Sequence, residues 1–185
     1  MNEIEVKILD IDKAAILARL REIGAELVKD EAQVNTIYDY PDLRLLGKKG
    51  YARIREIKDR ITQREAVYMT LKTMLSQEKY KIMDERETKI EDAQAGHGIF
   101  TGLGLIVRKI LIKDRISYLY KHSLIEIDDV KDREYPFPLL EIETQYEEEL
   151  REIVELLGYA MTDTTSMTMT EIMEKRRNAM NIALK

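Results

Sequence analysis

The sequence contains no cysteine, which excludes disulfide bonds, thiolate metal sites and cysteine nucleophiles together. Only two histidines are present, His97 and His122, and they stand apart in the chain, which argues against a histidine-based zinc site or a catalytic triad. No apolar run approaches the roughly 18 residues that a membrane-spanning helix needs. The N-terminus leads directly into EIEVK without a signal-like stretch. We therefore expect a cytoplasmic protein with no membrane partner.

An excess of basic residues is also missing. The 185 residues include 30 Lys and Arg against 35 Asp and Glu, so the net charge is −5 although 35% of the residues are charged. Because nucleic-acid-binding domains are generally basic, we expect no nucleic-acid partner. The length suits one domain with a substantial core, and no repeat, linker or low-complexity segment divides the chain. The sequence predicts a single domain over residues 1–185, with a C-terminal helix at about 168–185.

Alternation of apolar and charged residues predicts strands along most of the chain. The first, EIEVKI, places three charged residues on one side and Ile4, Val6 and Ile8 on the other. Helices are expected near 13–23 and 147–157, and the stretch 94–104 is expected to hold a helical turn and loops. These elements indicate an α+β domain dominated by antiparallel strands. Eight strands are predicted, at about 3–8, 37–40, 51–57, 67–73, 79–91, 105–120, 123–130 and 138–145.

The charged positions on these strands are grouped by sign. Like charges two residues apart on one face repel, so a solvated sheet face usually mixes the two signs. Eight antiparallel strands can close into a barrel that encloses one alternating set of side chains. A charged set cannot form a dry core, but it suits a water-filled tunnel. The alternative is an ordinary amphipathic sheet with a solvated, salt-bridged face. The acidic pairs are Glu3/Glu5, Glu85/Glu87, Glu126/Asp128 and Glu141/Glu143, and the cations are Lys7, Arg53/Arg55, Lys72 and Lys113/Arg115.

The charged groups of such a tunnel indicate which kinds of ligand it binds. Carboxylates that stay ionised together favour a divalent cation, and oxygen ligands suit Mg²⁺ or Mn²⁺. Guanidinium and ammonium groups favour polyanions, and Arg suits bidentate recognition of phosphate. The residues therefore indicate a metal ion together with a phosphate-bearing small molecule.

The order of these motifs resembles the CYTH proteins, also called triphosphate tunnel metalloenzymes. The family's ExExK motif corresponds to EIEVK at 3–7, and IYDYPDLRLLGKKGYARIR resembles its segment leading to a paired RxR. MTLK, ERETKIED, KDR, IEIDDV and LLEIET follow in the family's order. The resemblance spans roughly residues 1–160. Two segments depart from the pattern: DREYPFPLL lacks the usual Leu-Gly pair before EIE, and TTSMTMTEIM only loosely resembles the family's C-terminal helix.

The resemblance implies a closed eight-stranded antiparallel barrel with helices packed outside it. By analogy, Glu3, Glu5, Glu141 and Glu143 would hold metal, and Glu5, Lys7 and Glu143 would be catalytic. The phosphate-binding residues would be Lys7, Arg53, Arg55, Lys72, Lys113 and Arg115. A second metal ion or a water molecule would be held by Glu85, Glu87, Glu126 and Asp128, which could otherwise simply balance the cations.

Three functions are compatible with this resemblance. The first is a metal-dependent triphosphatase acting on inorganic triphosphate or on a nucleoside or other organic triphosphate. The second is a class IV adenylyl cyclase, which converts ATP to cyclic AMP and pyrophosphate. The third is a non-catalytic module that binds polyphosphate or nucleotide. The phosphate-binding residues do not distinguish among them, and a homodimer is compatible with the methionine-bearing C-terminal helix.

Overall fold

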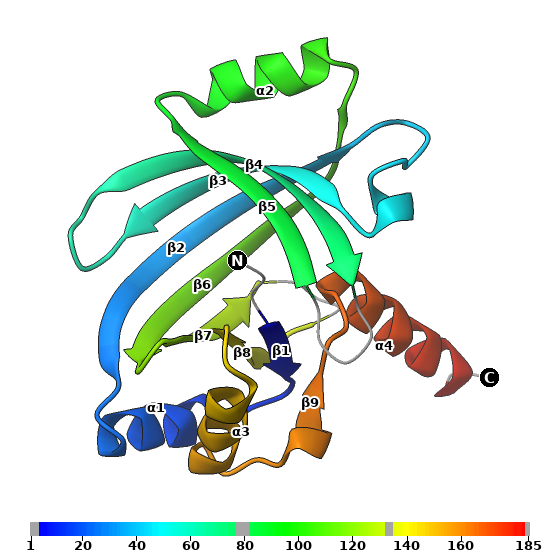
Figure 1. Ribbon diagram of the computed structural model, residues 1–185. Coiled ribbons are helices and arrows are strands. Elements are labelled where there is room, and N and C mark those ends of the chain that lie inside the picture. Colours follow the sequence, from blue (N-terminus) through cyan, green and yellow to red (C-terminus); the bar gives the residue numbers. More distant parts are fainter. Residues whose placement is uncertain (1–3, 77–81, 132–134, 184–185) are drawn as a thin grey trace.

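One antiparallel sheet forms the body of the protein, which we describe from a computed structural model covering residues 4–76, 82–131 and 135–183. Nine strands occur in the order β5-β4-β3-β2-β6-β7-β8-β1-β9 (Figure 1). The strands are β1 Ile4–Ile8, β2 Glu26–Asp39, β3 Tyr51–Asp59, β4 Glu65–Ser76, β5 Ile82–Ile90, β6 Ile106–Tyr120, β7 Ser123–Val130, β8 Pro138–Thr144 and β9 Thr164–Thr165. The helices of the described residues are α1 Lys13–Glu22, α2 Ala93–Gly102, α3 Glu147–Leu156 and α4 Met169–Ala183, with 3-10 turns at Leu46–Lys48 and Met161–Asp163.

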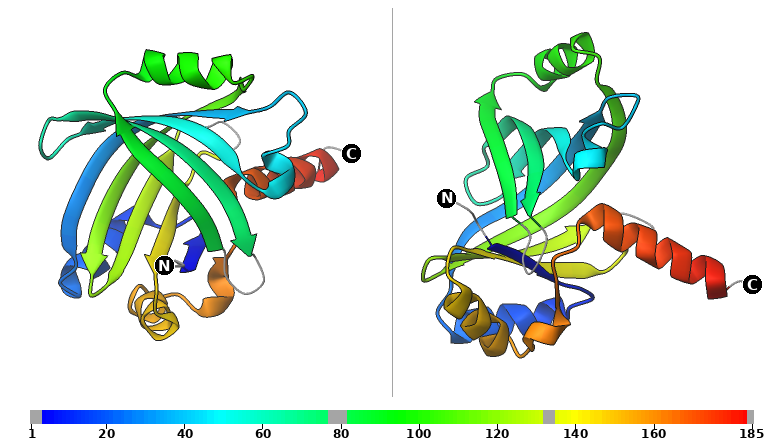
Figure 2. Two further views of the ribbon diagram at one scale, coloured as in Figure 1. Left: turned by 45° about the horizontal axis from the view of Figure 1, so that its top comes forward. Right: turned by 45° about the vertical axis from the view of Figure 1, so that its right-hand side comes forward.

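The sheet is strongly curled but remains open (Figure 2). The predicted α+β class is confirmed, whereas the predicted closed eight-stranded barrel is wrong. Closure requires every strand to have a partner on both sides. Here the described strands end at β5, which pairs with β4, and at β9, which pairs with β1. Only Lys7 and Ile8 of β1 pair with β9, so a two-residue strand occupies the edge that would have to meet β5. The result is a half-barrel.

Two elements are longer than the sequence pattern indicates. Strand β2 spans fourteen residues, although alternation identifies only its C-terminal end. Its first half is largely exposed, and pairing with the equally long β6 satisfies its backbone groups. Helix α2 is complete rather than a single helical turn, despite glycines that lower helix propensity. Asp92 caps it by accepting hydrogen bonds from the backbone N–H groups of Gln94 and Ala95.

Two apolar cores lie on the outer face of the half-barrel. Helices α1 and α3 cover one core, in which Ile8, Ile125 and Ile142 are buried among other aliphatic side chains. Helix α2 lies over the other, which includes Tyr38 and Ile54. The apolar sides of the strands therefore face outward against helices, as their alternation predicts. The charged sides line the interior, together with a third apolar core in which buried residues of β7 and β8 pack against α4.

Gly50, which precedes β3, allows the close approach of β4. A Cβ atom there would overlap the backbone carbonyl oxygen of Lys72 and lie 3.2 Å from the Cα atom of Thr73. We expect Gly50→Ala to lower the free energy of unfolding by about 1–3 kcal/mol, because a carbonyl inside a strand has little room to move. Gly47→Ala is the matched control, since a Cβ there meets no atom within 4 Å. Urea denaturation of both variants tests this expectation, and equal effects would contradict it.

Candidate functional site

The strand register brings the charged residues of neighbouring strands onto the inner face. Lys7 on β1 lies opposite Glu141 on β8, and Glu141 in turn lies opposite Glu126 on β7. Arg115 on β6 lies opposite Asp128 on β7. Side chains of directly opposite residues share a face of the sheet. Residues from distant parts of the sequence thus converge in the interior of the half-barrel.

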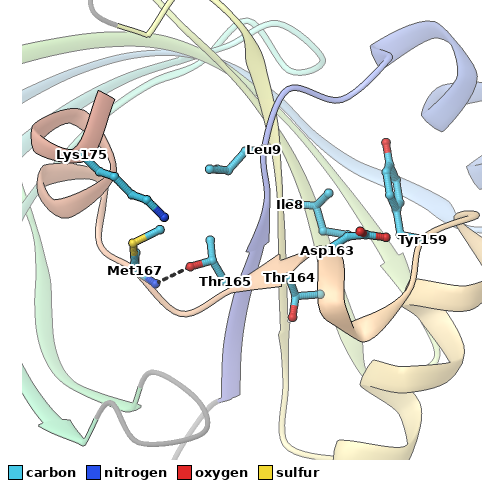
Figure 3. A pocket seen from close by; sticks show the side chains of 8 residues that line it. All are labelled: Ile8, Leu9, Tyr159, Asp163, Thr164, Thr165, Met167 and Lys175. Atoms are coloured by element: carbon cyan, nitrogen blue, oxygen red, sulfur yellow. Dashed lines mark hydrogen bonds between the residues drawn. The ribbon is translucent and has the colours of Figure 1, made fainter. Parts of the chain in front are cut away.

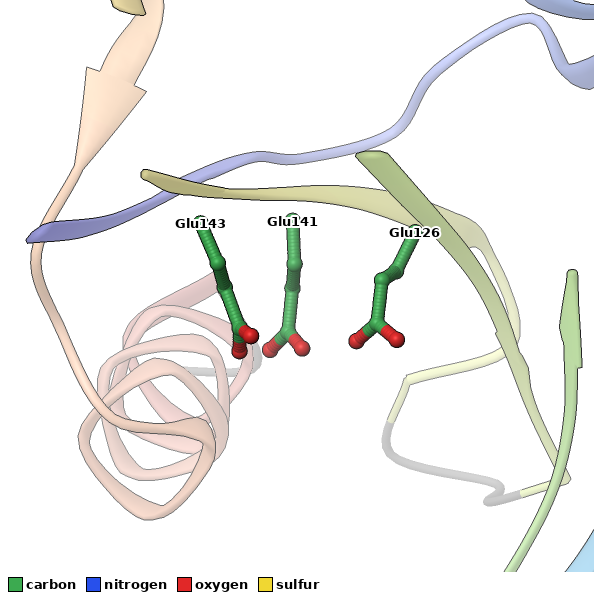
Figure 4. A group of neighbouring side chains, drawn as sticks. All are labelled: Glu126, Glu141 and Glu143. Atoms are coloured by element: carbon green, nitrogen blue, oxygen red, sulfur yellow. The ribbon is translucent and has the colours of Figure 1, made fainter. Parts of the chain in front are cut away.

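Three glutamates form an acidic cluster within this interior. Glu126, Glu141 and Glu143 each present a carboxylate oxygen, and these oxygens lie within 4.8 Å of one another. Figure 4 shows the three side chains extending from β7 and β8 in the same direction, with their carboxylates side by side. A divalent cation that prefers oxygen ligands can be held by such a set. The donor chemistry therefore fits Mg²⁺ or Mn²⁺.

Electrostatics within the acidic cluster favour an added cation. Burial, followed by the negative charges of Glu126, Glu141 and Glu5, raises the pKa of Glu143 to about 8. The positive charge of Arg115 opposes this shift without cancelling it. Like charges that are held close together cannot all ionise without cost. An added cation would therefore lower the electrostatic cost of ionising all three carboxylates of the acidic cluster.

Lys7 lies beside this cluster and is almost completely buried, with 2% of its surface exposed. Its ammonium group lies 3.0 Å from Glu141 Oε1 and also contacts Glu5. Burial alone would lower the pKa of Lys7, but the charges of Glu141 and Glu5 and the hydrogen bonds to them raise it above its ordinary value. Lys7 therefore stays protonated and can serve as a fixed positive charge.

Arg115 joins three carboxylates on two strands. Its Nε lies 2.5 Å from Asp128 Oδ1, its Nη2 lies 2.6 Å from Glu141 Oε2, and its Nη1 contacts Glu126. Lys113 shares Asp128, with its Nζ 2.5 Å from Oδ2. Burial would lower the pKa of Arg115, but Asp128, Glu126 and Glu141 raise it well above its usual value. Arg115 thus links the acidic cluster to the neighbouring cations of β6.

A second group of charges lies on β3, β4 and β5. Arg53 Nη2 lies 3.2 Å from Glu85 Oε1 and 3.3 Å from Glu87 Oε2, and Arg55 Nη2 lies 2.8 Å from Glu87 Oε1. Lys72 Nζ lies 2.6 Å from Glu85 Oε2. Burial would raise the pKa of Glu85, but Lys72 and the two arginines lower it below its ordinary value. Glu85 therefore remains ionised as a partner of the cations.

The two groups of charges face each other across the interior. Burial would lower the pKa of Lys72, but the charges of Tyr51 and Glu85 and that of Glu5 on β1 raise it above its ordinary value. Because β1 and β4 lie far apart in the strand order, this influence of Glu5 reflects the curl of the sheet. A ligand bound in the interior can therefore meet residues from both groups.

The predicted site residues meet different outcomes. Glu3 lies outside the described residues. The acidic cluster contains Glu141 and Glu143, which were predicted to hold the first metal ion. It also contains Glu126, which was predicted to hold a second metal ion or a water molecule. Glu5 lies opposite Glu143 in the strand register and contacts Lys7. The assignments of individual residues to metal and phosphate stay predictions. All six predicted phosphate-binding cations are paired with carboxylates: Lys7, Arg53, Arg55, Lys72, Lys113 and Arg115.

Several polar residues on the same face are absent from the predicted site. Gln33 and Asn35 of β2 are buried there, and Ser117 of β6 donates a hydrogen bond to Glu126 Oε1 at 2.9 Å. Thr70 of β4 donates to Glu87 Oε2 at 2.6 Å. The alternation in EAQVNT would have revealed Gln33 and Asn35, had the predicted strand been extended toward its N-terminus.

A separate hollow lies near β1, β9 and α4 (Figure 3). The backbone N–H of Met167 donates to Thr165 Oγ1 at 3.2 Å within it. None of the three glutamates of the acidic cluster lines this hollow, so we distinguish it from the candidate site. Its lining residues are Ile8, Leu9, Tyr159, Asp163, Thr164, Thr165, Met167 and Lys175.

Solved structures share this fold at low sequence identity. A protein from Pyrococcus horikoshii OT3 is 24% identical with a TM-score of 0.78, and the match covers 94% of this chain and 99% of that one. A Vibrio parahaemolyticus protein, provisionally assigned as an adenylate cyclase, is 16% identical with a TM-score of 0.76, covering 94% and 98%. A Hippeastrum protein, provisionally an adenylyl cyclase and described as having a dominant triphosphatase activity, is 15% identical with a TM-score of 0.69, covering 95% and 96%.

No curated protein sequence matches the chain. Within the part of the chain that the structure describes, no helix is both long and apolar enough to cross a membrane. The cytoplasmic location, the homodimer and the single domain over 1–185 stay predictions.

The family profile of the CYTH domain matches residues 1–168, and the resemblance noted in the motifs is thereby confirmed. The chain belongs to the CYTH domain family.

Proposed function

We propose that this protein is a metal-dependent triphosphatase that hydrolyses inorganic triphosphate or a nucleoside or other organic triphosphate. The acidic cluster of Glu126, Glu141 and Glu143 carries this proposal, because it lies beside Arg115 and faces a second set of cations. Triphosphate chemistry requires a divalent cation and several fixed positive charges in one place. The inner face of the half-barrel offers carboxylates that would hold the cation, together with the fixed positive charges.

The three glutamates of the acidic cluster would hold the metal ion. The raised pKa of Glu143 supports this role, since a site that resists full ionisation gains most from an added cation. When bound, Mg²⁺ or Mn²⁺ would neutralise phosphate oxygens and polarise the phosphorus for attack. The cations of the protein would contribute the rest of the charge stabilisation through preorganised contacts.

The basic residues would bind and orient the phosphate chain. Arg53 and Arg55 offer guanidinium groups suited to bidentate contacts with phosphate, whereas Lys7 and Lys72 act as point charges. All four are held by carboxylates, so a bound triphosphate would replace some of those ion pairs. In hydrolysis a water oxygen bonds to the terminal phosphorus, the bond to the bridging oxygen breaks, and orthophosphate and diphosphate leave.

The Hippeastrum neighbour, with its triphosphatase activity, supports hydrolysis as the first candidate. The Vibrio neighbour supports a second candidate, a class IV adenylyl cyclase. In that reaction the ribose 3′-oxygen bonds to the α-phosphorus and pyrophosphate leaves, while the hydroxyl proton is released. The same cations would stabilise either transition state. Analysis of the products therefore separates the candidates.

The test is to incubate the purified protein with ATP or inorganic triphosphate and Mg²⁺ or Mn²⁺, and to resolve the products by ion-exchange chromatography. We expect orthophosphate, no product in the presence of a chelator, and recovery when the metal is restored. Cyclic AMP with pyrophosphate would instead establish the cyclase. Metal-dependent binding of either compound without turnover would contradict both enzymes and support a binding module.

A further inference from the structure

A patch of buried polar atoms on β2 and β3 has no hydrogen-bond partner among the described residues. It comprises Gln33 Oε1, both side-chain amide atoms of Asn35, and the Nε atoms of Arg53 and Arg55. Gln33 and Asn35 are 1% and 2% exposed. Buried polar groups are nearly always hydrogen-bonded, because an unmatched one costs stability. Such a concentration of unmatched atoms on one face points to a ligand.

The register places this patch between two sets of cations. Gln33 lies opposite Lys113 on β6, and Asn35 lies opposite Arg55 on β3. Both amides therefore occupy the inner face, the same one that carries the candidate phosphate-binding residues. A triphosphate that contacts Arg55 and Lys113 together would extend across β2. The amides thus lie where the phosphate chain or the group attached to it would be.

The orientation of the Gln33 amide is set by a neighbour. Its Nε2 donates to Glu31 Oε2 at 2.6 Å, so its carbonyl oxygen points elsewhere and can only accept. Lys113, the donor opposite it in the sheet, is 2.5 Å from Asp128. Gln33 Oε1 has no donor among the described residues, so an incoming group that brings a hydrogen-bond donor would satisfy it.

Phosphate oxygens can satisfy only part of the patch. They accept hydrogen bonds and so suit Asn35 Nδ2 and the two arginine Nε–H groups, but they cannot donate to an amide oxygen. A hydroxyl group donates and accepts, which matches an amide oxygen beside an amide N–H. We propose that Gln33 and Asn35 bind a hydroxyl of the organic group attached to the triphosphate. The preferred substrate is then a hydroxyl-bearing organic triphosphate, such as a nucleoside triphosphate, rather than inorganic triphosphate.

This inference rests on the proposed function, and its test compares substrates. We would measure kcat/KM and calorimetric binding for ATP, its 2′-deoxy and 3′-deoxy analogues, and inorganic triphosphate. One hydrogen bond corresponds to about a tenfold effect. We expect the wild type to prefer ATP over inorganic triphosphate by about tenfold or more, and one deoxy analogue to lose about tenfold.

Two variants extend the comparison to the amides. Gln33→Met and Asn35→Leu should lower kcat/KM for ATP about tenfold more than for inorganic triphosphate. Gln94→Met, a matched change at an exposed position of α2, should leave both values unaltered. Asn35→Leu should unfold at no lower temperature than the wild type, because it removes an unmatched buried amide.

Equal losses for ATP and inorganic triphosphate in the two variants would overturn the inference. Such a result would assign the amides to phosphate or to metal-bound water, which both compounds share. A lower unfolding temperature with unchanged substrate preference would make the amides structural and would also overturn it. If no compound is hydrolysed, the proposed function fails, and the calorimetric ratio of ATP to inorganic triphosphate still tests the inference.

Discussion

Replacing Arg115 with methionine should destabilise the protein by about 3–5 kcal/mol, because the substitution leaves buried carboxylates without their counter-charge. The guanidinium contacts Asp128, Glu126 and Glu141, all of which are buried. Urea denaturation measures the effect. Arg60→Met is the control: its ion pairs with Asp30 and Asp114 are partly exposed, so its loss should cost about 1 kcal/mol or less.

The contribution of Arg115 to triphosphate hydrolysis is better tested with Arg115→Lys, which keeps the positive charge. A lysine has one ammonium group and cannot join three carboxylates in the geometry of the guanidinium. We expect kcat/KM for triphosphate hydrolysis to fall about 100-fold or more, the size of effect that follows loss of a preorganised charge contact. A folded variant with wild-type kinetics would remove Arg115 from the candidate site. Equal destabilisation by Arg115→Met and Arg60→Met would contradict the burial argument.

Replacing Glu143 with glutamine should stabilise the metal-free protein at neutral and alkaline pH. The pKa of Glu143 is raised from 4.5 to about 8 by burial and by the surrounding glutamates. A carboxyl with a raised folded-state pKa contributes stability that is present below the unfolded pKa and is lost as pH rises through the folded one. The wild type should therefore lose up to about 1.4 kcal/mol per pH unit between these two pKa values. Glu143→Gln lacks this slope.

The response of the unfolding temperature to metal ions is a second measurement on Glu143→Gln. A ligand that binds only the folded state raises the unfolding temperature by mass action. Mg²⁺ or Mn²⁺ should therefore stabilise the wild type and have a much smaller effect on Glu143→Gln, which loses one carboxylate of the acidic cluster. Thermal unfolding with and without metal, from pH 5 to pH 9, measures both effects. Glu148→Gln, an exposed change on α3, should behave as the wild type does. A metal response that survives intact in Glu143→Gln would contradict the proposed ligand set.

Part of the candidate site is readable in the sequence because strand periodicity is strict. Alternation in EIEVK and LLEIET predicts glutamates on one side and aliphatic residues on the other. The structure confirms this for the described residues of both segments except Leu139, which lies on the inner face. The same rule failed for β2, because its first half alternates weakly and is stabilised by pairing with β6. Gln33 and Asn35 follow that half and were missed because the predicted strand began only at Ile37.

Local patterns could not determine which charges meet. Glu126 was separated from Glu141 in the predicted roles, yet β7 and β8 are neighbours and place the two residues directly opposite each other. The number of strands was also insufficient to predict closure. Whether β5 reaches the opposite edge depends on the pairing of β1, which goes to β8 along its length and to β9 at two residues.

The sequence by itself determined which charged residues line the inner face, the direction in which most apolar sides point, and membership of the CYTH family. These properties depend on residue order and on the period of two in a strand, which are local. Only the tertiary structure decided that the sheet stays open, that Glu126, Glu141 and Glu143 share one site, and that every candidate phosphate-binding cation has a carboxylate partner. Those outcomes depend on strand register and sheet curvature, which arise from contacts between residues far apart in the chain.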